Sequence, residues 1–263
     1  MPRYRLTIEY AGTRYSGWQV QKNARTVQGE LLGAVRETTG VAAPDLQGSG
    51  RTDAGVHALR QVAHLDLPKA VAPETLRRQV NDLLPADINV LQIAPAPHRF
   101  HARHDAVSRS YVYQVARRRT AFAKPFVWWV KDDLDVRLMR EAAGVFVGMH
   151  DFRSFTDADP EEGSTRVQLG AIELKEDGDL VLVRVTGSHF VWKMVRRVVG
   201  VLVEAGRGRL TIDEIEGFLE APSPVPARLT APASGLFLER VLYPGEPPVG
   251  PLVAVTPLAP AVR

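Results

Sequence analysis

One short stretch of the chain, residues 48–58, combines an acid, an arginine and three glycines with almost no bulky apolar side chain. It reads Gly-Ser-Gly-Arg-Thr-Asp-Ala-Gly-Val-His-Ala, so that Asp53 follows Arg51 by two positions. Glycines let a backbone adopt left-handed or close-approach conformations, and such a stretch makes a poor core element. We therefore expect a shaped loop that presents Asp53 beside a cation, which favours the ionised carboxylate. A solvated ion pair on a surface turn is the alternative that the short string leaves open.

The whole string resembles the active-site motif of the TruA family, the bacterial tRNA pseudouridine synthases that act on the anticodon arm. The resemblance continues in the same order through most of the chain, from about Tyr4 to Tyr243. Its further motifs are Tyr10-Ala-Gly-Thr-Arg-Tyr-Ser-Gly-Trp-Gln-Val-Gln21, Phe100-His-Ala-Arg103, Tyr111-Val-Tyr113, His150-Asp-Phe-Arg-Ser-Phe155 and Phe190-Val-Trp-Lys-Met-Val-Arg196. Several separated motifs in one order are more specific than one short string.

The resemblance implies a catalytic set of three residues. Asp53 matches the family's catalytic carboxylate, and Arg51 is the adjacent cation that binds phosphate or holds the loop. Arg196 is implied to lie against the carboxylate. It stands in an apolar stretch, where an arginine is rarely buried without a partner. The alternative to a contact with the carboxylate is that the Arg196 side chain extends to solvent.

The implied reaction converts uridine to pseudouridine, at tRNA positions 38, 39 and 40 in this family. The N1–C1′ bond breaks, the base turns, and C5 joins C1′. There is no net redox change, so we expect no cofactor. A carboxylate can attack C1′ or remove the C2′ proton, and the sequence does not distinguish these routes. No His, Asp and Glu set has convincing metal-ligand spacing, so no metal is expected either.

The implied substrate contacts begin with Tyr111, which matches the family's active-site tyrosine. Its ring can stack on the target base once that base leaves the RNA stack. Contacts to tRNA are also expected from Arg14, Trp18, Gln19, Gln21, Arg25, Arg103 and Arg109. The last two lie in a basic stretch from Arg99 to Lys124, where six Arg and one Lys oppose one acid. Phosphate backbones attract such a cluster.

Two departures from the family pattern concern RNA contacts rather than the catalytic set. His104 stands where the resemblance leads us to expect an aromatic residue. Trp192 and Lys193 occupy a variable pair before Met194.

Two other classes of function stay open at this stage. One is a non-catalytic tRNA-binding or RNA-folding module, which keeps the basic surface without the chemistry. The other is a carboxylate-dependent glycosidase acting on small sugars. That class usually needs a second catalytic acid, and none stands near Asp53 in the motif.

Composition agrees with a tRNA-modifying enzyme without proving it. The 263 residues carry a net charge of +3 and no cysteine, which excludes disulfides, thiol catalysis and Cys-ligated zinc. No apolar run of membrane-spanning length and no signal-peptide pattern is present, so we expect a cytoplasmic protein without a membrane partner. The resemblance implies tRNA and a second copy of the chain, in a homodimer, as its partners.

The pattern of elements predicts an α+β fold. Strands are expected at 3–10, 62–67, 88–93, 108–116, 167–174, 180–186 and 236–242. Helices are expected at 26–39, 73–84 and 190–204, with two more opened by Asp135 and Thr211. The resemblance implies two ferredoxin-like halves joined into a mixed, mainly antiparallel sheet with helices on one side. The expected domains are 1–104 with the Asp53 loop, 105–245 with Tyr111 and Arg196, and a Pro-rich tail at 246–263.

Overall fold

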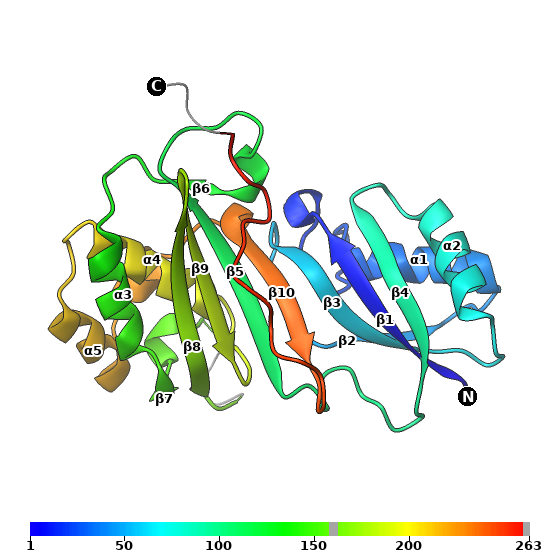
Figure 1. Ribbon diagram of the computed structural model, residues 1–263. Helices are drawn as coiled ribbons and strands as arrows, with labels where there is room; N and C mark the ends of the chain where they lie inside the picture. The colour runs from blue at the N-terminus through cyan, green and yellow to red at the C-terminus, as the bar shows by residue number, and fades with distance from the viewer. Residues whose placement is uncertain (158–162, 260–263) are drawn as a thin grey trace. The chain divides into compact units, whose positions relative to one another are not determined.

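The computed structural model describes residues 1–157 and 163–259. The chain forms two compact units. The first contains Met1–Val107 with Phe237–Pro248, and the second contains Ser108–Leu236 with residues from Val249 onward. Each unit is built from a β-sheet and helices, so the predicted α+β class is confirmed (Figure 1).

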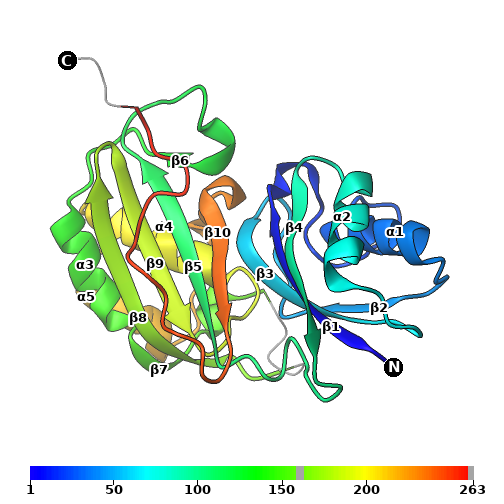
Figure 2. The same ribbon diagram turned by 45° about the vertical axis from the view of Figure 1, so that its right-hand side comes forward.

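The first unit has a sheet in the order β4-β1-β3-β10, with β2 also paired to β3. Its strands are β1 (Arg3–Tyr10), β2 (Asp45–Gly48), β3 (His57–Asp66), β4 (Ile88–Ala96) and β10 (Leu236–Leu242). Pairing is antiparallel except between β10 and β3, where Phe237 lies opposite His57. The helices α1 (Val27–Thr39) and α2 (Pro73–Leu83) pack together on one side of this sheet (Figures 1 and 2).

Local sequence signals set the elements of this unit. Strand β1 buries every second residue from Tyr4 to Tyr10, as its alternation predicts. Helix α1 starts where the Thr26 hydroxyl accepts from the backbone N–H of Gly29, and it ends at Gly40 with φ 69°. Helix α2 ends at Leu83, whose side chain is exposed.

The second unit has an antiparallel sheet in the order β5-β9-β8-β7, with β6 paired in parallel to β5. Its strands are β5 (Ser108–Ala116), β6 (Trp128–Trp129), β7 (Gly148–Asp151), β8 (Arg166–Asp177) and β9 (Leu180–Gly187). Its helices are α3 (Val136–Val145), α4 (Met194–Gly206), α5 (Ile212–Glu220) and α6 (Val225–Arg228). Short 3-10 turns include η1 (Gly12–Arg14) in the first unit and η3 (Arg153–Phe155) in the second.

Capping predictions in the second unit are confirmed, and one helix start is corrected. Asp135 accepts from two backbone N–H groups at the start of α3, and Thr211 forms a complete capping box with Glu214. Helix α4 begins at Met194, not at Phe190 as expected. The reason is Lys193, whose φ of 63° is left-handed and interrupts the helical backbone.

Residues 249–259 cross the face of the second unit's sheet that is opposite α4 (Figures 1 and 2). Leu252 is buried in an apolar cluster there with Val112 and Leu182. Oε1 of the buried Gln114 accepts from the backbone N–H groups of Val255 at 2.7 Å and Thr256 at 3.2 Å. Residues 249–259 are therefore a packed arm, while the last four residues of the expected tail lie outside the described residues. The expected domain boundaries themselves stay a prediction.

Among the described residues, no helix combines the length and apolar character needed to cross a lipid bilayer.

Candidate active site

Asp53 lies in the loop between β2 and β3, and this loop is held by backbone contacts to a second loop that follows β1. The N–H of Trp18 donates to the carbonyl of Thr52 at 3.1 Å. On the other side of Asp53, the N–H of Gly55 donates to the carbonyl of Tyr15 at 3.3 Å. Backbone contacts on both sides of Asp53 give the loop a fixed shape, as the glycine-rich string predicts.

Gln61 holds the start of the same loop, and sequence reasoning missed it. Its side chain is fully buried in β3. Its Oε1 accepts from the hydroxyl of Ser49 at 2.6 Å, and its Nε2 donates to the carbonyl of Gly50 at 3.1 Å. A glutamine in a strand carries no signal of such a role, because only the returning loop supplies its partners.

Two glycines let the loops approach one another. A Cβ on Gly17, whose φ is 91°, would lie 2.6 Å from the carbonyl oxygen of Thr52. A Cβ on Gly48 would lie 2.7 Å from the indole of Trp18. These positions exclude larger residues, because real Cβ atoms do not approach other heavy atoms so closely.

A hollow of about 300 Å³ adjoins the Asp53 loop within the first unit. It brings together four of the predicted substrate-contact and catalytic residues, namely Trp18, Gln19, Arg51 and Arg103. The remaining lining residues are Gln28, Gln47, Gly48, Gly50, His101 and His104. Arg51 Nε donates to Gln19 Oε1 at 3.2 Å. The lining contains two arginines and no carboxylate, so the hollow suits a phosphate-bearing ligand.

Three imidazoles pack in a row beside this hollow. The ring centroids of His64 and His101 are 4.7 Å apart, and those of His101 and His104 are 4.2 Å apart. Nδ1 of His64 accepts from the N–H of Ala102, and Nδ1 of His101 accepts from the N–H of Arg103. Burial lowers the pKa of both His64 and His101, which favours their neutral forms. Within the described ranges, no group of three or more His, Asp or Glu side chains is placed to hold a metal ion.

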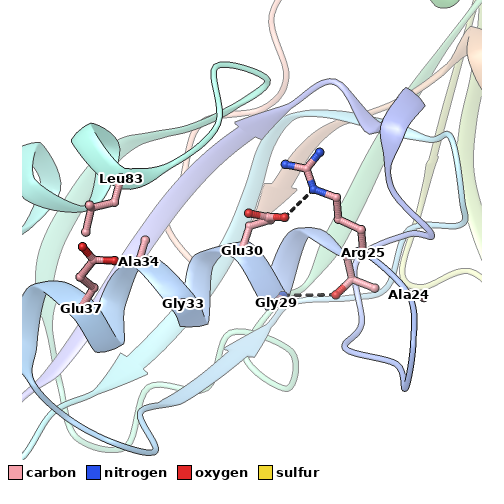
Figure 3. A pocket seen from close by; sticks show the side chains of 9 residues that line it. Ala24, Arg25, Gly29, Glu30, Gly33, Ala34, Glu37 and Leu83 are labelled. Atoms are coloured by element: carbon pink, nitrogen blue, oxygen red, sulfur yellow. Dashed lines mark hydrogen bonds and ion pairs between the residues drawn. The ribbon is translucent and has the colours of Figure 1, made fainter.

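Other predicted contact residues lie outside that hollow. Arg14 is 3.7 Å from Asp87, and Gln21 Nε2 donates to the carbonyl of Ser16 at 2.9 Å. Arg25 pairs with Glu30 at 2.5 Å, at a separate hollow of about 370 Å³ along α1 (Figure 3). That second hollow is lined by Ala24, Arg25, Thr26, Gly29, Glu30, Gly33, Ala34, Glu37 and Leu83. Its two glutamates make it a poor phosphate site.

In the second unit, Tyr111 and Arg109 both contact the segment that follows β9. The Tyr111 ring is half-buried and meets the Phe190 ring edge-on, with centroids 5.1 Å apart. Arg109 Nη1 donates to the carbonyl of Ser188 at 2.7 Å. Two predicted substrate contacts of β5 therefore share one neighbouring segment.

Arg196 is half-buried on α4, and its side chain is tied to the backbone of the same unit. Its Nε donates to the carbonyl of Ala231 at 2.7 Å, and its own carbonyl accepts from the N–H of Ala231 at 3.0 Å. The hydroxyl of Tyr113 donates to the carbonyl of Pro232 at 2.7 Å. Burial raises the pKa of Tyr113, and the nearby charge of Arg196 opposes that rise. Arg196 is thus held by two hydrogen bonds to Ala231 and lies near the buried Tyr113.

Part of the basic stretch that suggested RNA binding is neutralised within the protein. Arg117 pairs with Glu176 at 2.5 Å, and Arg118 pairs with Asp179 at 2.6 Å. The charge count over residues 99–124 therefore overstates the positive charge available to a phosphate backbone.

Comparison with known proteins places these features in context. A family model described as tRNA pseudouridine synthase matches residues 6–105 and 142–244. The chain is 43% identical over 252 residues to the tRNA pseudouridine synthase A of Rhodospirillum rubrum, covering 94% of this chain and 89% of that protein. It is 39% identical over 249 residues to the protein of the same name from Agrobacterium fabrum, covering 93% of each. A solved structure of a Cbf5-Nop10-Gar1 complex matches with a TM-score of 0.35 and 11% identity, over 76% of this chain and 54% of that one, which is too weak to carry an argument.

Proposed function

The chain belongs to the tRNA pseudouridine synthase family, and from this premise we propose that it isomerises uridines in the anticodon arm of tRNA with Asp53 as the catalytic carboxylate. Members of this family are isomerases, so the chain is an enzyme. The non-catalytic RNA-binding module and the glycosidase are therefore set aside.

The observation that carries the proposal is the Asp53 loop beside the 300 Å³ hollow. Contacts to Tyr15 and Trp18 fix the backbone on both sides of Asp53. Arg51, two positions away, lines the hollow together with Arg103, and no carboxylate is among the lining residues. A loop with a fixed backbone that carries Asp53, next to a hollow suited to an RNA phosphate, supports this chemistry because it limits the positions that the reacting groups can take.

The chemistry follows from a carboxylate placed at the sugar. In one route the carboxylate attacks C1′, the N1–C1′ electron pair leaves with the base, and C5 of the turned base then displaces the carboxylate. In the other route the carboxylate removes the C2′ proton as the base leaves, C5 attacks C1′ of the resulting glycal, and the carboxylic acid returns the proton to C2′. Both routes end with loss of the C5 proton and protonation of N1, so the atoms of substrate and product balance.

Tyr111 and Arg196 have supporting roles in the proposal. Tyr111 stacks on the uracil once it is taken out of the RNA stack, and its edge-on contact with Phe190 orients its ring. Arg196 supplies a positive charge that stabilises the anionic form of the carboxylate or of the departing base. Arg196→Met should therefore lower turnover strongly while RNA still binds.

The central experiment compares Asp53→Asn with wild type. Tritium release from C5-labelled tRNA should be lost in the variant, because an amide neither attacks C1′ nor removes a proton. Binding of tRNA should persist. The matched control is Asp82→Asn on the exposed side of α2, which should keep full turnover. Turnover of Asp53→Asn within tenfold of wild type would reject the assignment.

We also propose that the enzyme works in the cytoplasm as a homodimer, in which one subunit's surface helps to hold the tRNA that the other subunit modifies. Two-fold dimers are the commonest closed oligomers. Mixed dimers test this: an Asp53→Asn subunit with an intact RNA surface should restore activity to a subunit that keeps Asp53 and binds RNA poorly. Light scattering at monomer mass across micromolar concentrations would contradict the dimer.

A further inference from the structure

The segment between β9 and α4, residues 188–193, is fixed at its start to the two predicted substrate contacts of β5. Ser188 accepts from Arg109, and the Phe190 ring meets Tyr111 edge-on. The far end of the same segment carries Trp192 and Lys193, for which the proposed mechanism has no use.

Trp192 presents a large aromatic surface to solvent. The residue is 52% exposed. An indole normally contributes most to the stability of a fold or an interface when other groups cover it. Lys193 Nζ lies 4.5 Å from the centroid of the indole, within the range of a cation–π contact. The ammonium covers one side of the ring system and steadies it, and exposed indole surface remains for another flat partner.

Lys193 is itself fixed in an uncommon conformation. Its φ of 63° is one of two positive values at non-glycine positions in the part of the chain that the structure describes. Its ammonium pairs with Asp157 at 2.7 Å, and Asp157 also binds the guanidinium of the buried Arg197. The hydrogen bond from Lys193 is the main reason that the pKa of the Asp157 carboxyl is lowered. Left-handed backbone that ion pairs hold in place is typical of functional sites.

We propose that Trp192 is a base-stacking residue, on which an unpaired nucleobase next to the target uridine rests, and that Lys193 holds the indole in place. This inference rests on the proposed function, since it assumes an RNA substrate. A nucleobase fits the site because its flat π-system stacks on the exposed indole, as bases do on aromatic side chains that bind single-stranded RNA. A ring whose position is already fixed loses little conformational entropy when the base binds.

The first test measures the affinity of anticodon stem-loop RNA for Trp192→Ala and Trp192→Phe. Loss of stacking on the indole should weaken binding about 10- to 100-fold in Trp192→Ala. Trp192→Phe should restore most of the affinity. The single-turnover rate at saturating RNA should change less than the affinity, because Trp192 takes no part in the proposed bond changes.

Trp129→Ala is the matched control, because Trp129 is a 42% exposed indole of the same unit on β6. It should bind RNA like wild type. Wild-type affinity in Trp192→Ala would overturn the inference, as would an equal loss in both alanine variants. If wild type itself neither bound nor modified this RNA, the proposed function would fail instead.

The second test identifies the stacked base. Abasic substitutions are placed one at a time along the RNA loop and combined with Trp192→Ala. At one position the abasic RNA should weaken wild-type binding as much as Trp192→Ala does, and the two changes together should cost no more than either alone. Full additivity at every loop position would contradict stacking, and conversion of Trp192→Ala to a monomer would assign the indole to a subunit contact.

Lys193→Gly separates the role of the side chain from that of the backbone. Glycine accepts a φ of 63° without strain, so the fold should be retained. RNA affinity should fall, because the cation–π contact that holds the indole is lost. Unchanged affinity would show that Lys193 does not hold the indole in place.

Discussion

Gly12 and Val56 approach so closely that a Cβ on Gly12 would lie 1.9 Å from the carbonyl oxygen of Val56. The N–H of Gly12 also donates to Nδ1 of the buried His57 at 3.0 Å, and the His57 ring stacks on Phe237 at 4.7 Å. The segment after β1 therefore lies directly against the end of the Asp53 loop. This contact places a structural requirement on a glycine far from Asp53 in the sequence.

Gly12→Ala should lower turnover by displacing the Asp53 loop. The added methyl overlaps a backbone carbonyl, which cannot turn away as a flexible side chain would. We expect a loss of at least tenfold in kcat, because small displacements of a catalytic group are costly, with weaker effects on RNA affinity. Steady-state kinetics with C5-labelled tRNA would measure both.

The matched control is Gly33→Ala in α1, where a Cβ would meet nothing within 4 Å. Alanine is favoured over glycine inside a helix by about 0.5 to 1 kcal/mol. This variant should keep full activity and unfold at a slightly higher temperature. Equal activity in the Gly12 and Gly33 variants would show that the Gly12 contact does not position the loop.

Arg51→Ala should weaken RNA binding and reduce its dependence on salt. The side chain lines the phosphate-suited hollow, where its Nε is oriented by Gln19. Loss of one phosphate contact should reduce the slope of log affinity against log salt by about 0.7 to 0.9. Arg78→Ala, an exposed arginine on α2, should leave the slope unchanged and serves as the control. An unchanged slope for Arg51→Ala would show that the guanidinium faces away from phosphate.

Gln114→Leu should destabilise the second unit by releasing the C-terminal arm. The buried amide accepts from two backbone N–H groups of the arm and donates to the Thr256 hydroxyl at 2.8 Å. Leaving a buried donor without an acceptor costs about 1 to 3 kcal/mol. Thermal unfolding should show a clear drop in Tm. Gln168→Leu, at an exposed position of β8, should not, and a similar Tm for both variants would contradict this role of the arm.

Strands with strictly alternating apolar residues, and helices with a capping residue at each end, could be predicted from the sequence almost residue for residue. The bounds of β1, β5 and β10 match the expectation, and α1 starts after Thr26 and ends before Gly40. In each case the signal is local, because alternation or capping acts within a few residues.

Features that depend on distant partners could not be predicted. The start of α4 is set by Lys193, whose ion-pair partner lies 36 residues earlier in the chain. The partners that neutralise Arg117 and Arg118 lie 59 and 61 residues away. For the candidate site, Arg51 and Arg103 could be predicted by resemblance, but their convergence on one hollow required the fold.

The ion pair of Arg3 with Asp66 should contribute to the stability of the protein against acid. Arg3 Nε donates to Asp66 Oδ1 at 2.7 Å, and this hydrogen bond is the main reason that the pKa of the Asp66 carboxyl is lowered. A carboxyl whose pKa is lower in the folded state stabilises the fold above its unfolded value of about 3.9, and that stabilisation is lost as the pH falls toward the folded value. Asp66→Asn should therefore reduce the free energy of unfolding near pH 7 and flatten its decline below about pH 4, a decline to which other acids still contribute. Urea unfolding across this pH range would measure both effects, with the exposed Asp82→Asn as control. If the free energy of unfolding of Asp66→Asn ran parallel to that of wild type as the pH changes, the pair would not contribute to acid unfolding.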